Sequence, residues 1–215
     1  MTKLQLAIDL VPQDDLEAVI LPLLPVIDVL EAGTPLIKRY GLGVVRMLRR
    51  IGPDHLLVAD MKTMDAGGLE AEMAFSAGAD IMTVLACASN ATISAAVAVA
   101  QTHGKHVVAD LIGVPDKVVR AREVAALGVA FLGIHTGTDD QASGANPLAD
   151  LETITRAVDV QTVVAGGINA TSLASILALR PAIVIVGSGI LGQPDPLMAA
   201  TELHRILTTH MDQSG

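Results

Sequence analysis

Short apolar runs alternate with longer segments of helical periodicity along the whole chain. The apolar runs predict eight strands, at residues 4–9, 26–31, 55–61, 80–85, 106–111, 129–135, 162–165 and 182–186. The segments between and after them predict helices near residues 14–23, 35–49, 68–77, 91–103, 116–127, 147–157, 171–179 and 195–210. Strands that alternate with helices at this spacing indicate βαβ units and a parallel sheet.

The eight strand–helix units follow one another without a linker or a low-complexity segment. This organisation predicts an α/β fold in which residues 1–215 form a single (β/α)8 TIM barrel domain. A doubly wound open sheet is the alternative architecture. Because the chain has no Trp, one Tyr and two Phe, we expect its core to consist of aliphatic side chains and Met.

Polar residues fall at or next to the last position of five predicted strands. These residues are Asp9, Glu31, Asp60 with Lys62, Asp110 and His135. In a barrel, the carboxyl ends of all strands meet at one mouth, where enzymes of this fold keep their active sites. A single terminal Asp could simply cap the next helix. Acids and bases at the same end of five strands favour a catalytic mouth instead.

Residues 60–65 read Asp-Met-Lys-Thr-Met-Asp and place a lysine between two carboxylates at the end of the third strand. Strand alternation predicts that Asp60 and Lys62 point to the same face. Burying an acid and a base together is costly unless they pair or bind a ligand. The segment is therefore either an ordinary strand-terminal ion pair or a site of perturbed acid–base chemistry.

The last two strands end in glycine-containing loops. Gly166 and Gly167 follow the seventh strand, and Gly187 and Ser188 follow the eighth. Glycine lets a ligand approach the backbone, whose amides bind anions, and these two loops are a frequent phosphate site in barrels. Ordinary turn glycine is the alternative for either loop alone. Because neither loop contains Arg or Lys, we expect backbone amides and Ser188 to bind the phosphate of a phosphorylated substrate.

Composition narrows the class of partner and the compartment. The net charge of -9 and the scarcity of aromatic side chains disfavour a nucleic-acid partner. The one cysteine, Cys87, excludes an internal disulfide and fits a reducing compartment, and its apolar surroundings predict a small core residue. Asp9 interrupts the N-terminal apolar run, and no run approaches the ~18 residues of a membrane span. We therefore expect a cytoplasmic chain without a membrane partner.

Several segments together resemble the 3-hexulose-6-phosphate synthase family. The similar segments are residues 4–9, 31–37, 60–67, 77–80, 110–112, 135–141, 165–168 and 186–187. That family belongs to the orotidine 5′-monophosphate decarboxylase suprafamily, which is marked by Asp-x-Lys-x-x-Asp. The resemblance spans nearly the whole chain in the same order, and it is the combination of segments that is specific.

The resemblance implies a metal-dependent aldehyde-lyase of one-carbon metabolism, an aldolase of the ribulose monophosphate pathway. Such an enzyme joins formaldehyde to D-ribulose 5-phosphate and gives D-arabino-3-hexulose 6-phosphate through a metal-stabilised 1,2-enediolate. The implied cofactor is Mg2+, with Mn2+ as the alternative. The resemblance also implies a homodimer with shared active sites, in which Asp65 reaches the site of the partner subunit.

On this interpretation, each polar residue of the mouth has an expected role. Glu31 and Asp60 are the expected ligands of a hard cation. Lys62 supplies positive charge where the oxyanion develops, and His135 moves the proton, because imidazole titrates near neutral pH. Asp110 is expected to orient Lys62.

Two further residues are expected to contact the substrate or its neighbours. Asp9 is predicted to contact the hydroxyl groups of the sugar phosphate. Asp65 is predicted to hold Lys62 or a substrate hydroxyl across the subunit boundary. This role of Asp65 follows from the resemblance alone.

Two other functions stay open. The first is the sister activity, 3-keto-L-gulonate-6-phosphate decarboxylase. Enzymes with this activity have a sequence similar to His-Arg-x-Arg after the sixth strand. Here the segment reads His135-Thr136-Gly137-Thr138 and lacks both arginines, which favours the synthase. Many relatives also place Arg where this chain has Ser188, which bears on phosphate affinity. The second alternative is a catalytically silent barrel that acts as a binding protein.

Overall fold

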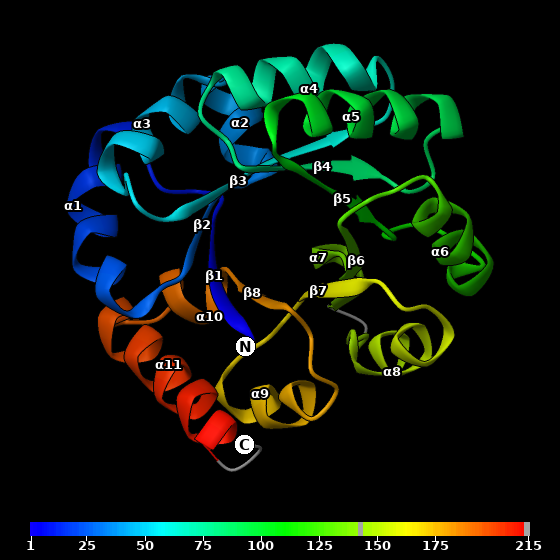
Figure 1. Cartoon of the computed structure of the whole chain (residues 1–215). Coiled ribbons are helices and arrows are strands. Elements are labelled where there is room, and N and C mark those ends of the chain that lie inside the picture. The colour runs from blue at the N-terminus through cyan, green and yellow to red at the C-terminus, as the bar shows by residue number, and fades with distance from the viewer. Residues whose placement is uncertain (142–143, 213–215) are drawn as a thin grey trace.

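The computed structural model describes residues 1–141 and 144–212 and shows a closed parallel barrel (Figure 1). Its strands are β1 (Lys3–Ile8), β2 (Val29–Ala32), β3 (Leu56–Thr63), β4 (Ile81–Leu85), β5 (His106–Asp110), β6 (Phe131–His135), β7 (Gln161–Ala165) and β8 (Ile183–Val186). They pair in chain order, and β8 pairs with β1 to close the ring. The predicted (β/α)8 barrel is confirmed, and the open sheet is excluded.

Helices surround the barrel, as the ring of coiled ribbons in Figure 1 shows. The helices that follow β1 to β4 are η1 (Gln13–Asp15), α1 (Leu16–Ile20), η2 (Leu21–Val26), α2 (Thr34–Tyr40), α3 (Gly43–Ile51), α4 (Gly67–Ser76) and α5 (Asn90–His103). Those that follow β5 to β8 are α6 (Lys117–Ala126), α7 (Thr138–Gln141), α8 (Leu148–Ala157), α9 (Ala170–Leu177), α10 (Ser188–Leu191) and α11 (Pro196–Asp212). None of the described helices is long and apolar enough to cross a bilayer.

Glycine and proline account for the main differences from the predicted elements. The helix expected at 35–49 is divided into α2 and α3, because Gly41 adopts a φ of 66° after Tyr40. The helix expected at 14–23 contains only a short α-helical part between two 3-10 segments. Pro22 and Pro25 lack the amide hydrogens that a longer α-helix would need there. The second strand accordingly begins at Val29, three residues later than expected.

Two layers of aliphatic side chains form the core. The larger layer lies between the strands and the helices, and it contains fully buried residues such as Leu6, Leu30 and Leu132. The smaller layer fills the inside of the barrel and consists of Val29, Val58, Ile81, Val108, Val163 and Ile183. β-branched side chains suit this layer because they fit the pleated surface of a strand. The inner layer supports the polar residues above it.

Candidate active site

A cavity of ≈ 680 Å³ opens at the carboxyl end of the barrel strands. Its floor is apolar and includes Val58, Ile81 and Val163 of the inner layer. Its upper wall carries ten of the predicted site residues, namely Asp9, Glu31, Asp60, Lys62, Asp110, His135, Gly166, Gly167, Gly187 and Ser188. The structure thus brings together groups from seven strand ends that are far apart in the sequence.

Asp60 and Lys62 form an ion pair inside this cavity. The Lys62 Nζ atom donates a hydrogen bond to Asp60 Oδ2 at 2.5 Å, and Asp60 is only 6% exposed. The hydroxyl of Thr34 lies 2.6 Å from the same oxygen, and the hydroxyl of Thr83 donates to Oδ1 at 2.7 Å. Burial opposes ionisation of Asp60, but the charge of Lys62 and these hydrogen bonds hold its pKa below the usual value. The carboxylate is therefore ionised and fixed in orientation.

Asp110 links this lysine to the histidine. Its Oδ2 atom lies 3.7 Å from Lys62 Nζ and 3.1 Å from His135 Nδ1. Because a carboxylate accepts hydrogen bonds, we assign the proton of the imidazole to Nδ1, which leaves Nε2 as the basic nitrogen. Burial lowers the pKa of Lys62, but the charges of Asp60 and Asp110 more than offset this effect and raise the pKa. Lys62 is thus a firmly held cation.

Glu31 is a buried carboxyl group whose surroundings oppose its ionisation. It lies in β2, is 6% exposed and accepts a hydrogen bond from Gln5 Nε2 at 2.6 Å. Burial, followed by the nearby charge of Asp60, raises the pKa of Glu31 to about 8. The ionised form of this group needs more positive charge than Lys62 supplies.

Asp9 depends on a glycine of the next loop for its position. A Cβ atom on Gly33 would lie 2.0 Å from Asp9 Oδ1, so only glycine leaves room for this carboxylate. Burial and the charge of Asp60 raise the pKa of Asp9, while Lys62 and His135 act in the opposite direction. Asp9 is therefore held beside the charged cluster at the end of β1.

The two glycine loops line the other side of the same cavity. Gly166 and Gly167 adopt φ values of 115° and 66°, which side chains disfavour. A Cβ atom on Gly166 would also lie 2.6 Å from the carbonyl oxygen of Thr136. Gly187 and the exposed Ser188 follow β8 directly. The loop after β7 therefore requires glycine at positions 166 and 167, whereas a Cβ atom on Gly187 would make only ordinary contacts, the nearest at 3.5 Å.

Two residues lie outside this cavity. Asp65 is exposed and accepts a hydrogen bond from the amide of Ala66 at 2.7 Å, so one chain alone does not bring it to Lys62. Cys87 is exposed as well, and its Sγ atom lies 3.9 Å from Met64 Sδ. The expectation of a core cysteine was wrong, because β4 ends at Leu85 and Cys87 belongs to the loop that follows.

Four residues that the sequence reasoning missed build this site, namely Gln5, Gly33, Thr34 and Thr83. The three polar ones are all buried, and each bonds to a predicted carboxylate. A signal was available for Gln5 and Thr83, because each is a polar residue between two apolar ones in a strand. Nothing comparable marks Gly33, whose importance depends on the folded position of Asp9.

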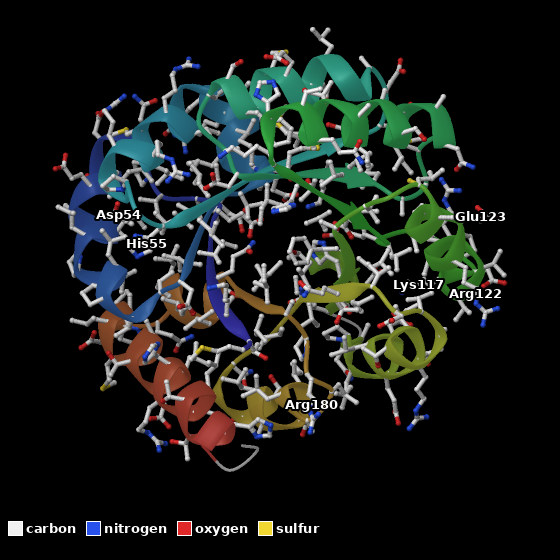
Figure 2. All side chains as sticks on the ribbon, viewed as in Figure 1. Asp54, His55, Lys117, Arg122, Glu123 and Arg180 are labelled. Carbon is white, nitrogen blue, oxygen red and sulfur yellow. The ribbon has the colours of Figure 1, made fainter. Side chains whose placement is uncertain are left out.

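A second hollow, of ≈ 360 Å³, lies between α6 and α8. It contains the ion pair between Lys117 and Asp150. Figure 2 labels Lys117 together with Arg122 and Glu123, and it places all three on α6, outside the ring of strands. None of the predicted site residues lines this hollow. The predicted residues that line a cavity lie at the mouth of the barrel instead.

The fold and this cavity together define a class, that of (β/α)8 barrels with a lysine held between carboxylates at the mouth. The model of the orotidine 5'-phosphate decarboxylase / HUMPS family matches residues 2–203. The 3-hexulose-6-phosphate synthase of Mycobacterium gastri is 43% identical over 201 residues, which are 94% of this chain and 97% of that protein. The chain therefore belongs to the orotidine 5'-phosphate decarboxylase / HUMPS family, as its motifs predict.

Solved structures of two relatives agree with this assignment. The 3-hexulose-6-phosphate synthase from Salmonella typhimurium matches with a TM-score of 0.95 at 35% identity, covering 97% of this chain and 100% of that one. The 3-keto-L-gulonate-6-phosphate decarboxylase from Vibrio cholerae O1 biovar El Tor str. N16961 matches with a TM-score of 0.84 at 27% identity, covering 97% and 98%. The synthase is thus more similar to this chain in both sequence and fold.

Proposed function

We propose that this chain is an aldehyde-lyase that joins formaldehyde to D-ribulose 5-phosphate and forms D-arabino-3-hexulose 6-phosphate through a 1,2-enediolate. The similarity to synthases over nearly the full length is the observation that carries this proposal. The charge of the cavity supports it. Among the described residues that line the cavity, Lys62 is the only Lys or Arg, beside several carboxylates.

This charge distribution favours the synthase over the decarboxylase. The substrate of the decarboxylase carries a carboxylate in addition to its phosphate, and a second anionic group is repelled by an acidic cavity. Formaldehyde is neutral, so the aldol reaction brings only the phosphate. The segment after β6, which includes Thr136 and Thr138, supplies no arginine that would pair with a carboxylate.

The carboxylates of Glu31 and Asp60 fit a divalent cation. Among the residues that the structure describes, no three His, Cys, Asp or Glu side chains form a complete metal cage. Two carboxylates together with substrate and water oxygens are nevertheless the usual ligands of Mg2+, and Mn2+ accepts the same oxygens. The raised pKa of Glu31 shows that its ionised form lacks compensating charge. When bound, the cation would supply positive charge to oxygen atoms of the substrate.

The protein residues account for the proton transfers. We propose that His135 Nε2 removes a proton from C1 of ribulose 5-phosphate, while Asp110 holds the imidazole by its Nδ1 hydrogen. Lys62 stabilises the negative charge that then develops on the enediolate oxygens. C1 forms the new bond to the carbon of formaldehyde, and the formaldehyde oxygen takes the proton back from His135. The proton count therefore balances within one turnover.

The sugar phosphate would bind across the cavity. Backbone amides of the loops at Gly166 and Gly187, together with the hydroxyl of Ser188, are the proposed phosphate donors. The carboxylate of Asp9 would accept hydrogen bonds from sugar hydroxyls, because it lies between the charged cluster and Gly187. This orientation places C1 toward His135 and the phosphate toward β7 and β8.

We further propose a homodimer that completes the site. Asp65 is exposed, and exposed apolar side chains surround it in the sequence, at Met64, Leu69 and Met73. Apolar residues beside a charged one are typical of a surface that a partner covers. Asp65 of the partner subunit would then approach Lys62, because Asp65 does not reach the Lys62 of its own chain.

The test follows formaldehyde consumption by the purified protein. The proposal predicts consumption only when ribulose 5-phosphate and Mg2+ are both present, and EDTA should stop it. Consumption without ribulose 5-phosphate contradicts the proposal. Release of CO2 from 3-keto-L-gulonate 6-phosphate faster than formaldehyde fixation supports the decarboxylase instead. A protein inactive in both assays, with Lys62→Ala indistinguishable from the parent chain, supports the silent barrel.

A further inference from the structure

The register between β3 and β4 changes at the catalytic lysine. Ala59 pairs with Met82 and Thr63 pairs with Val84, so residues 60–62 lie opposite Thr83 alone. Such a bulge interrupts the backbone ladder and leaves some amides without their usual partners. Both Asp60 and Lys62, which belong to this bulge, line the cavity.

Lys62 has a left-handed backbone within this bulge. Its φ is 45°, in a region that residues with a side chain rarely adopt. Such a conformation persists only where surrounding contacts impose it, and it is typical of functional sites.

The side chain of Thr83 replaces the missing ladder contact. Its Oγ1 atom accepts a hydrogen bond from the Lys62 amide at 2.9 Å and donates one to Asp60 Oδ1 at 2.7 Å. A hydroxyl has one donor and two acceptor positions, so both bonds form at once. Thr83 is 7% exposed, and water therefore does not readily take over either role. One hydroxyl thus fixes the backbone of the lysine and the carboxylate that pairs with it.

We propose that Thr83 is a positioning residue for Lys62. By holding the Lys62 amide and the Asp60 carboxylate together, its hydroxyl sets where the ammonium group lies in the cavity. This inference rests on the proposed function, because it assigns Thr83 to the group that stabilises the enediolate. It requires no contact between Thr83 and the substrate.

Thr34 provides a comparison within the same site. Its hydroxyl lies 2.6 Å from Asp60 Oδ2 and 2.8 Å from the Asp60 carbonyl oxygen, but it does not contact the Lys62 amide. Loss of the Thr34 hydroxyl should therefore weaken the hold on Asp60 alone. Loss of the Thr83 hydroxyl should also release the backbone of Lys62.

The test compares Thr83→Val, which keeps the shape but removes the hydroxyl, with Thr83→Ser, which keeps the hydroxyl. We expect Thr83→Val to lower kcat about 10- to 100-fold, as is typical for groups that orient a catalytic residue, with KM for ribulose 5-phosphate nearly unchanged. Thr83→Ser should restore most of kcat. The control is Thr92→Val, because Thr92 is also buried and its hydroxyl bonds to Ser89 at 3.0 Å, outside the cavity.

A second readout does not depend on the reaction. Amide hydrogen exchange at Lys62 should be faster in Thr83→Val than in the parent chain, and unchanged in Thr83→Ser and Thr34→Val. If Thr83→Val does not fold, Thr83→Ala carries the same comparison.

Unchanged exchange at Lys62, unchanged kcat in Thr83→Val, or an equal loss of kcat in Thr92→Val overturns the inference. A parent chain that fixes no formaldehyde overturns the proposed function, while the exchange rates still decide whether Thr83 holds Lys62.

Discussion

Replacement of Glu31 by glutamine should change how the stability of the metal-free protein depends on pH. The pKa of Glu31 is raised from 4.5 to about 8 in the folded chain, first by burial and then by Asp60. Between these pH values the folded chain keeps a proton that the unfolded chain has lost. The contribution of Glu31 to the free energy of unfolding therefore falls as pH rises through this interval and stops falling above about pH 8.

The size of this effect follows from the same pKa. At ~1.4 kcal/mol per pKa unit, the rise from 4.5 to about 8 corresponds to roughly 5 kcal/mol of stability lost between acidic and alkaline pH. Glu31→Gln removes the titrating group but keeps an oxygen that accepts the hydrogen bond from Gln5. The variant should therefore be increasingly more stable than the parent chain as pH rises, and the difference should level off above about pH 8.

The assay is urea unfolding in EDTA across pH 5 to 9, followed by far-UV circular dichroism because the chain has no Trp. Protein concentration is held constant, since assembly would shift the transition. The matched control is Glu17→Gln at an exposed position, which should parallel the parent chain. Saturating Mg2+ should stabilise the parent chain at pH 9 and have less effect on Glu31→Gln. Parallel curves for Glu31→Gln and the parent chain would show that the pKa of Glu31 is not raised in the folded chain.

Three further substitutions separate the parts of the site. Lys62→Ala should lower kcat for formaldehyde fixation by about 10²- to 10³-fold, since it removes charge that stabilises the transition state; retention of half the activity would exclude this role. Gly33→Ala should lower kcat/KM for ribulose 5-phosphate by about 10²-fold, because the added Cβ atom would lie 2.0 Å from Asp9 Oδ1 and would displace that carboxylate. Steady-state kinetics equal to those of the parent chain would contradict the assigned position of Asp9. Asp80→Asn should lower the free energy of unfolding by about 1–2 kcal/mol without changing kcat, because partly buried Asp80 pairs with Arg49 at the amino end of the barrel, away from the cavity. Urea unfolding checks this prediction, and a loss of activity with intact stability would contradict it.

The fold was predictable because its signals are local and repeated. Each strand is predicted by an apolar run. The polar residues that end these strands, such as Asp9 and His135, all lie at the same end of the barrel. Closure of the ring then follows from the number of units. The boundary errors occurred where a single residue changes the backbone, at Gly41 and at the prolines near residue 22, because the apolar pattern does not record such effects.

The sequence predicted which residues meet at the cavity better than it predicted their geometry. The same-face prediction for Asp60 and Lys62 was correct, since both line the cavity, but alternation is only part of the reason. The bulge opposite Thr83 adds residues to the strand, and its left-handed lysine is visible only in the folded chain. A sequence pattern of period two does not predict a change of register, so the contribution of Thr83 could not be inferred from it.

Homodimer formation and the cytoplasmic location stay predictions. Asp65 has the exposure that an interface residue of the isolated chain should have, and size measurements in solution with and without ribulose 5-phosphate check the assembly. A monomer that is fully active would contradict the shared site.

One paired measurement distinguishes aldol fixation from decarboxylation at this cavity. The purified chain is given formaldehyde with ribulose 5-phosphate and Mg2+ in one reaction, and 3-keto-L-gulonate 6-phosphate with Mg2+ in the other. We expect formaldehyde to be consumed and D-arabino-3-hexulose 6-phosphate to accumulate. The kcat/KM of formaldehyde fixation should be higher than the kcat/KM of CO2 release. Faster CO2 release, or formaldehyde consumption that does not need ribulose 5-phosphate, would contradict it.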